Sequence, residues 1–313
     1  MEEALSAVEK AFQDHARGLI RVEPRVTMEV RGEANSAILL PANHLNQGFY
    51  GLKQASSFPG NPGQGLPTVF SDIHLYSART GRPLALVGAV HLTAVKTGAA
   101  SAVATRYLAP EGKVTLALIG TGVQARTQAA GIGLVRELRQ IRLHDLDRFR
   151  AEELARELEG EVGAAEIKIF DDPDQCVAGA EVISTCTTST SPVFRTESIG
   201  PGCHINAVGS FTPAMQEIEA ETVARADKVV TDVSSETWRV AGDLLKALDK
   251  GRISRERIDA ELGRIVTGEA PGRERQTGIT LYESVGFGAL DIALAGALYL
   301  RAEEERFGLE VEW

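Results

Sequence analysis

The stretch Lys113-Val-Thr-Leu-Ala-Leu-Ile-Gly-Thr-Gly-Val-Gln-Ala125 decides the fold of this chain. Its first half is a short apolar run, Val114 to Ile119, which predicts a strand buried in a parallel sheet. The run ends at a pair of glycines, and good helix formers follow. Gly120 permits a tight turn, Gly122 lets the backbone approach a ligand closely, and Ala125 is small enough for the helix to pack closely on the strand.

This strand, turn and helix together predict a site for a dinucleotide. Free backbone N–H groups and the positive end of the helix dipole point toward a pyrophosphate at such a turn. A second strand, residues 140–144, ends in Asp145, about 25 residues after Gly120, where an acidic residue meets the ribose hydroxyls of the adenosine. The alternative is a tight turn without a ligand, but the order of strand, motif, helix, strand and acid argues against it.

Asp145 also bears on which nicotinamide cofactor binds. A carboxylate at this position favours NAD(H), because it repels the 2′-phosphate of NADP(H). Arg148 and Arg150 lie nearby in the sequence and leave NADP(H) open. We therefore expect NAD(H) as the cofactor, with NADP(H) as the alternative.

Length, charge and residue usage exclude several classes of function. The chain has 313 residues, enough for two domains with a large core. It contains no apolar run of transmembrane length and no signal-like segment, and its net charge of −10 argues against nucleic acid or an anionic membrane as a partner. The six histidines show no HxH or HExxH spacing, so we expect no metal site. Cys176, Cys186 and Cys203 form no CxxC pair, which favours reduced thiols and a cytoplasmic location.

The first third of the chain has the pattern of an α+β region. Residues 1–19 carry apolar side chains at helical spacing, and a helix of small residues is expected over 91–108. Between these helices, strands are expected over 24–30, 36–40, 49–57, 68–76 and 83–87. The break at Pro110-Glu-Gly112 then marks a domain boundary.

Beyond this break, strands and helices alternate, as a doubly wound parallel sheet requires. Further strands are expected over 166–170, 180–185, 204–208 and 228–232, and a helix over 148–158. Residues 279–299 predict one long helix of small residues. This helix is too apolar to be a solvated tail, so we expect it to pack on the first domain or across a subunit interface.

Ligands of doubly wound sheets bind outside the carboxyl ends of the strands. The loops after residues 185 and 208 are therefore expected to flank the nicotinamide, where Thr185, Thr187 and Ser210 can hydrogen-bond its amide or ribose. The alternative is ordinary turn chemistry, since Ser and Thr are common in loops. The candidate cofactor residues are Thr68, Gly120, Thr121, Gly122, Val123, Gln124, Asp145, Thr185, Thr187, Ser210 and Ser284.

Several motifs along nearly the whole chain resemble those of the ornithine cyclodeaminase/mu-crystallin family. Glycine motifs occur in many folds, whereas the Lys53 segment and the run Leu-Thr-x-x-(Arg/Lys)-Thr-x-Ala ahead of a central Rossmann unit are far more particular. The matching segments are Leu40-Pro-Ala42, Gly51-Leu-Lys53, Pro59-Gly-Asn61, Thr80-Gly81, Leu92-Thr-Ala-Val-Lys-Thr-Gly-Ala-Ala100, Gly120-Thr-Gly-Val-Gln-Ala125 and Thr280-Leu-Tyr-Glu-Ser-Val-Gly286.

The resemblance implies an α/β fold with two domains. A doubly wound Rossmann NAD(P)-binding domain, residues 112–283, would be inserted in an α+β domain made from residues 1–111 and 284–313. That second domain would bind the substrate and form a homodimer through its sheet. The implied chemistry is hydride transfer between nicotinamide and the α-carbon of an amino acid or its cyclic imine. Members include ornithine cyclodeaminases, alanine dehydrogenases, reductases of cyclic ketimines, and a vertebrate lens crystallin that also binds thyroid hormone.

By the same resemblance, Arg25 and Lys53 match the basic residues that hold the substrate carboxylate. Lys96 stands where the family usually has arginine, and lysine keeps the charge but loses the planar two-pronged grip on a carboxylate. From the residues alone, each of these cations could instead be a solvated surface charge. We take Arg25, Lys53 and Lys96 as the catalytic candidates, with Lys53 or a bound water as the proton source.

The sequence departs from the family pattern at two places. Val87-Gly88 replaces an Asp-Gly pair, and Phe211 stands in the loop Gly209-Ser-Phe-Thr-Pro213 where the cyclodeaminases carry a catalytic aspartate. Phenylalanine cannot manage the protons of an amine substrate, so ornithine cyclisation is disfavoured. The phenyl ring would pack either against a flat cyclic imine or in the core.

We therefore expect an NAD(P)H-dependent reductase of cyclic α-imino acids, with Δ1-pyrroline-2-carboxylate and its six-membered homologue as the first candidate substrates. The first alternative is an alanine dehydrogenase acting on pyruvate plus ammonia, which needs the same grip on a carboxylate. Ornithine cyclodeaminase follows, and then a non-catalytic NAD(P)H-dependent binding protein.

Overall fold

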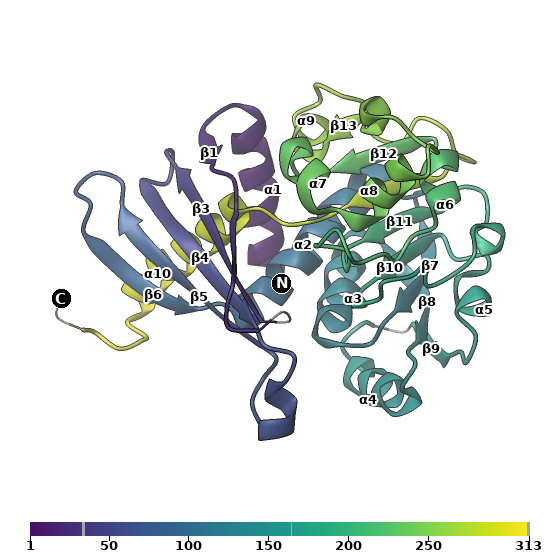
Figure 1. The fold of residues 1–313 in the computed structure, drawn as a ribbon, viewed down its shortest axis with the longest axis horizontal. Coiled ribbons are helices and arrows are strands. Elements are labelled where there is room, and N and C mark those ends of the chain that lie inside the picture. Colours follow the sequence, from purple (N-terminus) through teal and green to yellow (C-terminus); the bar gives the residue numbers. More distant parts are fainter. Residues whose placement is uncertain (33–34, 164, 312–313) are drawn as a thin grey trace. The chain divides into compact units, whose positions relative to one another are not determined.

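The computed structural model describes residues 1–32, 35–163 and 165–311 and divides into two compact units. The parallel-sheet unit comprises Met1–Leu5 and Thr97–Gly286, and the antiparallel-sheet unit comprises Ser6–Lys96 and Phe287–Trp313. The predicted fold class is confirmed, because an α/β unit is inserted between two segments of an α+β unit (Figure 1). The chain passes between the units after Leu5, within helix α2 (Val90–Leu108) and ahead of Phe287.

In the described part of the parallel-sheet unit, an eight-stranded, wholly parallel sheet has the order β13-β12-β14-β11-β10-β7-β8-β9. The order reverses at the pair of β7 and β10, because successive strands are added on opposite sides of β7. Thr185 lies opposite Ile119 in this pair, so the loops that follow the two strands begin side by side. The strands are β7 (Lys113–Ile119), β8 (Glu137–His144), β9 (Glu166–Ile169), β10 (Val182–Thr185), β11 (His204–Ala207), β12 (Lys228–Thr231), β13 (Ala260–Glu261) and β14 (Thr280–Glu283).

Strand β7 is buried on both faces, as its unbroken apolar run predicts. Leu116 and Leu118 pack in one hydrophobic core, together with residues of helices α3 (Val123–Val135) and α4 (Arg148–Leu158). Ile119 belongs to a second core on the other face. The remaining helices of this unit are α5 (Pro173–Val177), α6 (Ala220–Arg225), α7 (Ser234–Val240), α8 (Gly242–Asp249) and α9 (Leu262–Val266), with short 3-10 turns at Thr196–Ser198 and Arg255–Arg257.

The prediction of a single helix over residues 279–299 is wrong in its first part. Thr280–Glu283 form β14, which pairs with β11 on one side and β12 on the other. Its β-branched and aromatic side chains suit a buried strand. Gly286 then has φ of 66°, so no regular element continues through it, and helix α10 runs from Gly288 to Glu305.

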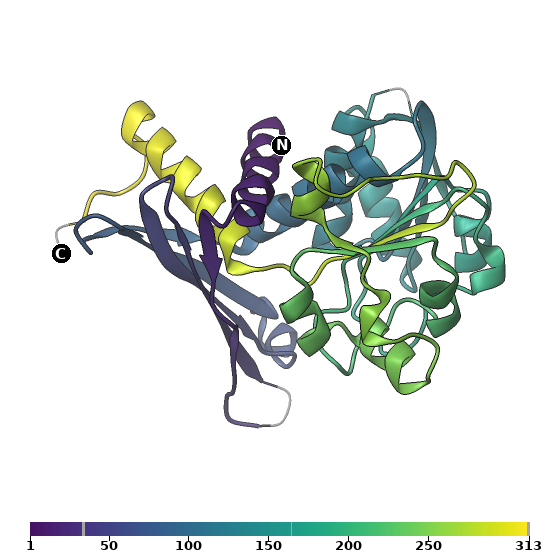
Figure 2. The ribbon, with the colours of Figure 1, turned by 90° about the horizontal axis from the view of Figure 1, so that it is seen from above.

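The antiparallel-sheet unit is built on the strand order β1-β3-β4-β5-β6, with β2 paired to β3. Helix α10 packs on β3, β4 and β5 (Figures 1 and 2). Two of its glycines allow this approach, since a Cβ on Gly288 would lie 2.7 Å from the Leu40 carbonyl oxygen and one on Gly296 would lie 2.6 Å from the Phe49 ring. The elements are α1 (Glu2–Ala16), β1 (Ile20–Val22), β2 (Val26–Glu29), β3 (Ser36–His44), β4 (Phe49–Ser57), a 3-10 turn (Asn61–Gln64), β5 (Val69–Ser77) and β6 (Pro83–Gly88).

The described residues contain neither a membrane-spanning helix nor a metal cluster, and their cysteines are unpaired. No helix among them is both long enough and apolar enough to cross a membrane. No group of three or more His, Cys, Asp or Glu side chains among them is arranged to hold a metal ion. The three cysteines are free thiols, and burial raises the pKa of Cys176 and of Cys203 to about 12.

Helices α2 and α3 cross closely at glycines within the parallel-sheet unit, and this contact yields a prediction. A Cβ on Gly131 would lie 2.5 Å from the Gly98 carbonyl oxygen, whereas a Cβ on Gly133 would meet Leu138 at an ordinary 3.5 Å. Gly131→Ala should therefore lower the free energy of unfolding by about 1–3 kcal/mol. Gly133→Ala, in the same helix, should raise it by up to about 1 kcal/mol. Urea denaturation of both variants checks this, and equal effects would contradict the packing described.

Candidate functional site

The glycine loop after β7 has a backbone that only glycine adopts easily. Gly120 has φ of +87°, and its N–H donates to the His144 carbonyl oxygen at 2.9 Å. A Cβ at this position would lie 2.8 Å from Cγ2 of Thr187 and 2.9 Å from the Cys186 carbonyl oxygen. Gly120 therefore lets the loops after β7 and β10 come together at the reversal in strand order.

The amino end of α3 is open to a ligand. Gly122 is its N-cap and supplies no side chain to the free N–H groups. Among the described residues, apart from the adjoining backbone, no atom lies within 4 Å of the place where a Gly122 Cβ would stand, and the neighbouring Val123 is 71% exposed. These residues fit a pyrophosphate, because its oxygens can accept from uncapped N–H groups at the positive end of the helix.

Asp145 lies directly beside this loop. Its Oδ2 accepts from the Thr121 backbone N–H at 2.8 Å and from the Thr121 hydroxyl at 2.9 Å, while Oδ1 accepts from the Asp147 N–H at 2.9 Å. Burial acts to raise the pKa of this carboxyl, but the hydrogen bonds outweigh it and leave the pKa below its ordinary value. Asp145 is therefore a carboxylate at neutral pH, as a partner for ribose hydroxyls must be.

The loops after β10 and β11 are held by one buried acid, Glu217, which the sequence analysis did not single out. Glu217 accepts from the Thr185 hydroxyl at 2.7 Å, from the Thr187 hydroxyl at 2.7 Å and backbone N–H at 2.6 Å, and from the Gly209 N–H at 2.8 Å. Thr185 is fully buried and Ser210 nearly so. The hydroxyl hydrogens of Thr185 and Thr187 are thus used in hydrogen bonds to Glu217, which hold the loop. No spacing or motif in the sequence indicates this role for Glu217.

Further buried acids lie along the same part of the sheet. Asp232 accepts from the Ser284 hydroxyl at 3.1 Å and from the Gly286 N–H at 2.7 Å, and so fixes the loop that carries Ser284. Burial, and then the neighbouring acids Asp243 and Glu217, raise the pKa of Glu283 well above its ordinary value. An acid at the carboxyl end of a strand is the signal that could have identified Asp232 and Glu283.

Two of the three candidate cations, Lys53 and Lys96, come together in the antiparallel-sheet unit, and Arg25 is buried in the same unit. Lys53 of β4, Lys96 of α2 and Arg25 are all buried, with exposed fractions of 4–6%. Lys96 Nζ donates to Asp291 Oδ1 of α10 at 2.7 Å, and Lys53 Nζ lies 3.4 Å from the same oxygen. These lysines are therefore not solvated surface charges. Two buried ammonium groups share one carboxylate, which leaves this group of residues with an excess of positive charge.

Lys53 has an unusual acidity for a lysine. Its pKa is lowered from 10.5 to about 8, because burial, and to a smaller extent the positive charge of Lys96, outweigh the opposing effect of Asp291. Lys53 is thus mostly protonated at neutral pH but can release its proton far more readily than an ordinary lysine. These properties suit both a carboxylate ligand and a proton donor.

Thr68 and Phe211, two other residues named as candidates from the sequence, are exposed rather than buried. Thr68 lies in the antiparallel-sheet unit and is exposed, ahead of β5. Phe211 is 40% exposed, which rules out the core, one of the two placements left open by the sequence. An aromatic side chain left this accessible in the loop after β11 remains available to a ligand.

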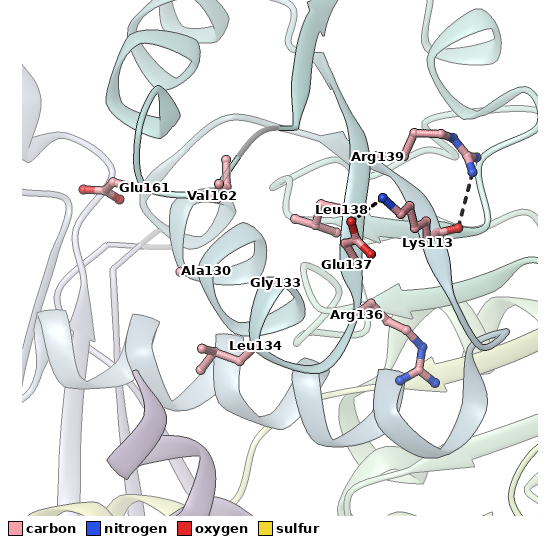
Figure 3. A pocket seen from close by; sticks show the side chains of 11 residues that line it. Lys113, Ala130, Gly133, Leu134, Arg136, Glu137, Leu138, Arg139, Glu161 and Val162 are labelled. Atoms are coloured by element: carbon pink, nitrogen blue, oxygen red, sulfur yellow. Dashed lines mark hydrogen bonds and ion pairs between the residues drawn. The ribbon is translucent and has the colours of Figure 1, made fainter.

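A hollow of about 470 Å³ lies at the amino ends of β7 and β8, away from the glycine loop (Figure 3). Its charged side chains are already engaged. Lys113 pairs with Glu137, Arg139 pairs with Glu181, and Arg136 donates to the Pro110 carbonyl oxygen at 2.7 Å. Two of the three cations that line the hollow are thus paired with carboxylates, and the third donates to a backbone carbonyl oxygen.

Comparison with known proteins places this geometry in a family. The family of ornithine cyclodeaminases and mu-crystallin matches residues 1–306. The chain belongs to the ornithine cyclodeaminase/mu-crystallin family. One curated relative, a Δ1-pyrroline-2-carboxylate reductase of Bacillus cereus, is 36% identical over 289 residues, covering 92% of this chain and 88% of the relative.

Two solved structures share the whole fold. The first is that of Thermococcus litoralis Δ1-pyrroline-2-carboxylate reductase in complex with NADH and L-proline, with a TM-score of 0.96, 34% identity, and coverage of 99% of this chain and 96% of that one. The second is that of an archaeal alanine dehydrogenase dimer with bound NAD, with a TM-score of 0.94, 32% identity, and coverage of 100% and 95%.

The buried acids predict how stability depends on pH. Burial raises the pKa of Asp243 from 3.8 to about 7. Its Oδ1 accepts two backbone N–H groups, whereas Oδ2 is buried and has no hydrogen-bond partner among the described residues. The pKa of this carboxyl is higher in the folded than in the unfolded protein. Its contribution to stability is therefore complete below the unfolded pKa and is lost as the pH rises through about 7. Asp243→Asn cannot ionise, so the variant should be more stable than wild type at pH 8, by roughly 1–2 kcal/mol.

Urea denaturation at several pH values measures this effect. Asp249→Asn, an exposed change at the end of the same helix α8, is the control and should leave the pH dependence as in wild type. A loss of stability in Asp243→Asn at pH 8 would contradict the protonation described.

Proposed function

We propose that this protein is an NADH-dependent reductase of cyclic α-imino acids, with Δ1-pyrroline-2-carboxylate as the first candidate substrate. The observation that carries the proposal is the buried cluster of Lys53, Lys96 and Asp291. Burying two ammonium groups against one carboxylate is unfavourable unless a further anion balances them. The carboxylate of an α-imino acid would supply that charge, with buried Arg25 as a third cation.

The cofactor would be held by the parallel-sheet unit. The uncapped amino end of α3, residues 122–124, would bind the pyrophosphate, and Asp145 would bind the adenosine ribose. The solved relatives with bound NADH and NAD support this assignment, and the charged state of Asp145 favours NAD(H) over NADP(H). When bound, the nicotinamide supplies the hydride for reduction of the C=N carbon.

Lys53 would supply the proton. Reduction of an imine needs one proton at nitrogen besides the hydride, and a general acid works best when its pKa lies near the working pH. The pKa of Lys53, lowered to about 8 by burial, meets this condition. Lys96, which is hydrogen-bonded to Asp291, would serve instead as an anchor for the substrate carboxylate.

Alanine dehydrogenase is the second candidate, because one of the solved relatives is an alanine dehydrogenase. It would use the same cations for pyruvate and would reduce the imine formed with ammonia. Dependence on ammonium separates the two activities: NADH oxidation with the cyclic imine should be indifferent to ammonium, whereas oxidation with pyruvate should require it. The accessible Phe211 in place of a loop acid disfavours ornithine cyclisation.

We also propose a homodimer formed through the sheet of the antiparallel-sheet unit. The face of this sheet opposite to α10 carries large exposed apolar side chains, including Val26, Met28, Phe70 and Leu86. Such a patch marks an interaction surface. The solved alanine dehydrogenase, described as a dimer, supports this proposal. We further propose that the antiparallel-sheet unit binds the substrate and that the parallel-sheet unit binds the nucleotide. We also propose a cytoplasmic location.

Replacement of Lys53 tests the proposed chemistry. Lys53→Met should lower kcat/KM for Δ1-pyrroline-2-carboxylate by about 10²–10³-fold, because both a carboxylate ligand and a general acid are lost. NADH binding should be unchanged, and Asp291 keeps Lys96 as a partner, so the variant should fold. Lys10→Met, at a half-exposed lysine of α1, is the control. A kcat/KM within a few-fold of wild type in Lys53→Met would overturn the assignment.

Replacement of Asp145 tests the choice of cofactor. Asp145→Ser should weaken NADH binding by roughly 1–2 kcal/mol, the scale of one or two hydrogen bonds to the ribose. Loss of the carboxylate also removes repulsion of a 2′-phosphate, so NADPH binding should weaken less than NADH binding. Fluorescence titration with both cofactors measures the two affinities. An NADH affinity equal to that of wild type would show that the ribose binds elsewhere.

A further inference from the structure

Asp291 is the acid that pairs with both buried lysines, Lys53 and Lys96, and it comes from the C-terminal helix α10. It lies in the first turn of α10, within a run of small and apolar residues that is otherwise buried as a packing surface. It is 2% exposed, far too buried for a solvated carboxylate. A charge this deeply buried is retained only when it is paired, and its partners are the ammonium groups of Lys53 and Lys96.

The two ion pairs are unequal. Lys96 Nζ is at hydrogen-bond distance from Asp291 Oδ1, 2.7 Å, whereas Lys53 Nζ stands off at 3.4 Å from the same atom. Asp291 Oδ2 is buried and has no hydrogen-bond partner in the described part of the chain. Lys96 is therefore fixed, and Lys53 is held mainly by charge and remains free to give its hydrogens to another acceptor.

The residues beside Lys53 on the two neighbouring strands are apolar. Its register partners on β3 and β5 are Leu40 and Ile73. The charged groups that act on Lys53 are Asp291 from α10 and Lys96 from α2. The protonation of Lys53 thus depends on opposing effects. Asp291 favours the ammonium form, whereas burial and the positive charge of Lys96 disfavour it.

We propose that Asp291 is a positioning residue, whose carboxylate keeps Lys53 charged as the proton donor and fixes Lys96 as the anchor for the substrate carboxylate. This inference rests on the proposed imine reduction. In that step hydride adds to the C=N carbon, the imine nitrogen takes a proton from the Lys53 ammonium, and the neutral Lys53 amine regains a proton from water. Without Asp291, two buried ammonium groups would repel each other and Lys53 would lose its proton at lower pH.

Asp291→Asn tests the proposal by two independent readouts. In the first, the alkaline limb of the pH profile of kcat/KM for Δ1-pyrroline-2-carboxylate should move to lower pH by about one pH unit, since a charge-assisted hydrogen bond and its ion pair are lost. Titration of the substrate itself is common to both enzymes and cancels in the comparison. In the second, NMR titration of ¹³C-labelled lysine, assigned with Lys53→Arg, should show the pKa of Lys53 reduced in the variant without any substrate.

The matched control is Asp14→Asn. Asp14 is equally buried in the same unit, is paired with Lys10 and lies 2.9 Å from His44, but it does not contact Lys53. This variant should lose stability without moving the alkaline limb. Asp291→Glu, which restores the charge, should return the limb toward the wild-type position. A merely structural role for Asp291 would lower activity at all pH values alike and leave the limb in place.

Lys96→Met gives a test of opposite sign, should Asp291→Asn fail to fold. Removing Lys96 takes away its positive charge and makes Lys53 the remaining ion-pair partner of Asp291. The pKa of Lys53 should therefore rise above its wild-type value of about 8. An unchanged or lower pKa would overturn the proposal. If wild type does not reduce the imine, the proposed function fails, while the NMR titrations still decide the role of Asp291.

Discussion

Strand β7 pairs in parallel with β8 on one side and with β10 on the other, and the arrangement of the nucleotide site depends on this pairing. The register that sets Thr185 opposite Ile119 brings the ends of β7 and β10 together. Only a glycine at position 120 lets the two following loops meet there, and the uncapped end of α3 then faces solvent. Asp145 reaches this loop because β8 lies beside β7 and ends next to it.

Buried charged groups have different kinds of partner in the two units. In the parallel-sheet unit, buried acids accept backbone and hydroxyl hydrogens: Glu217 organises the loops after β10 and β11, and Asp232 organises the loop that carries Ser284. In the antiparallel-sheet unit, buried lysines outnumber the carboxylate that they share. The first pattern fixes the backbone that would surround a cofactor, and the second leaves an excess positive charge, which the proposed anionic substrate would balance.

The elements that could be predicted from the sequence are those with a strong local pattern. The apolar run Val114–Ile119 must be a buried strand, and the helix over 148–158 has its bounds confirmed. The segment 279–299 was misassigned because β14 and α10 are both apolar, and only pairing with β11 and β12 distinguishes strand from helix. The unit boundary within α2 has no local signal either, since one continuous helix carries the chain across it.

The site could be predicted only in part, for a related reason. Glycines and a strand-end acid predict a nucleotide site, and basic residues in particular motifs predict an anchor for a carboxylate. The partners that tune them are remote in sequence: Asp291 is 195 residues from Lys96, and Glu217 is 32 residues from Thr185. Such pairings follow from the tertiary fold, so no spacing reveals them.

Transfer of hydrogen from the cofactor to the substrate tests the central claim most directly. The protein would be given Δ1-pyrroline-2-carboxylate and NADH deuterated at the reactive nicotinamide carbon, without ammonium, and the product would be examined by mass spectrometry and NMR. The account predicts L-proline with deuterium at the α-carbon. Proline without deuterium, or deuterated alanine formed only from pyruvate plus ammonium while the cyclic imine is left unreacted, would contradict it.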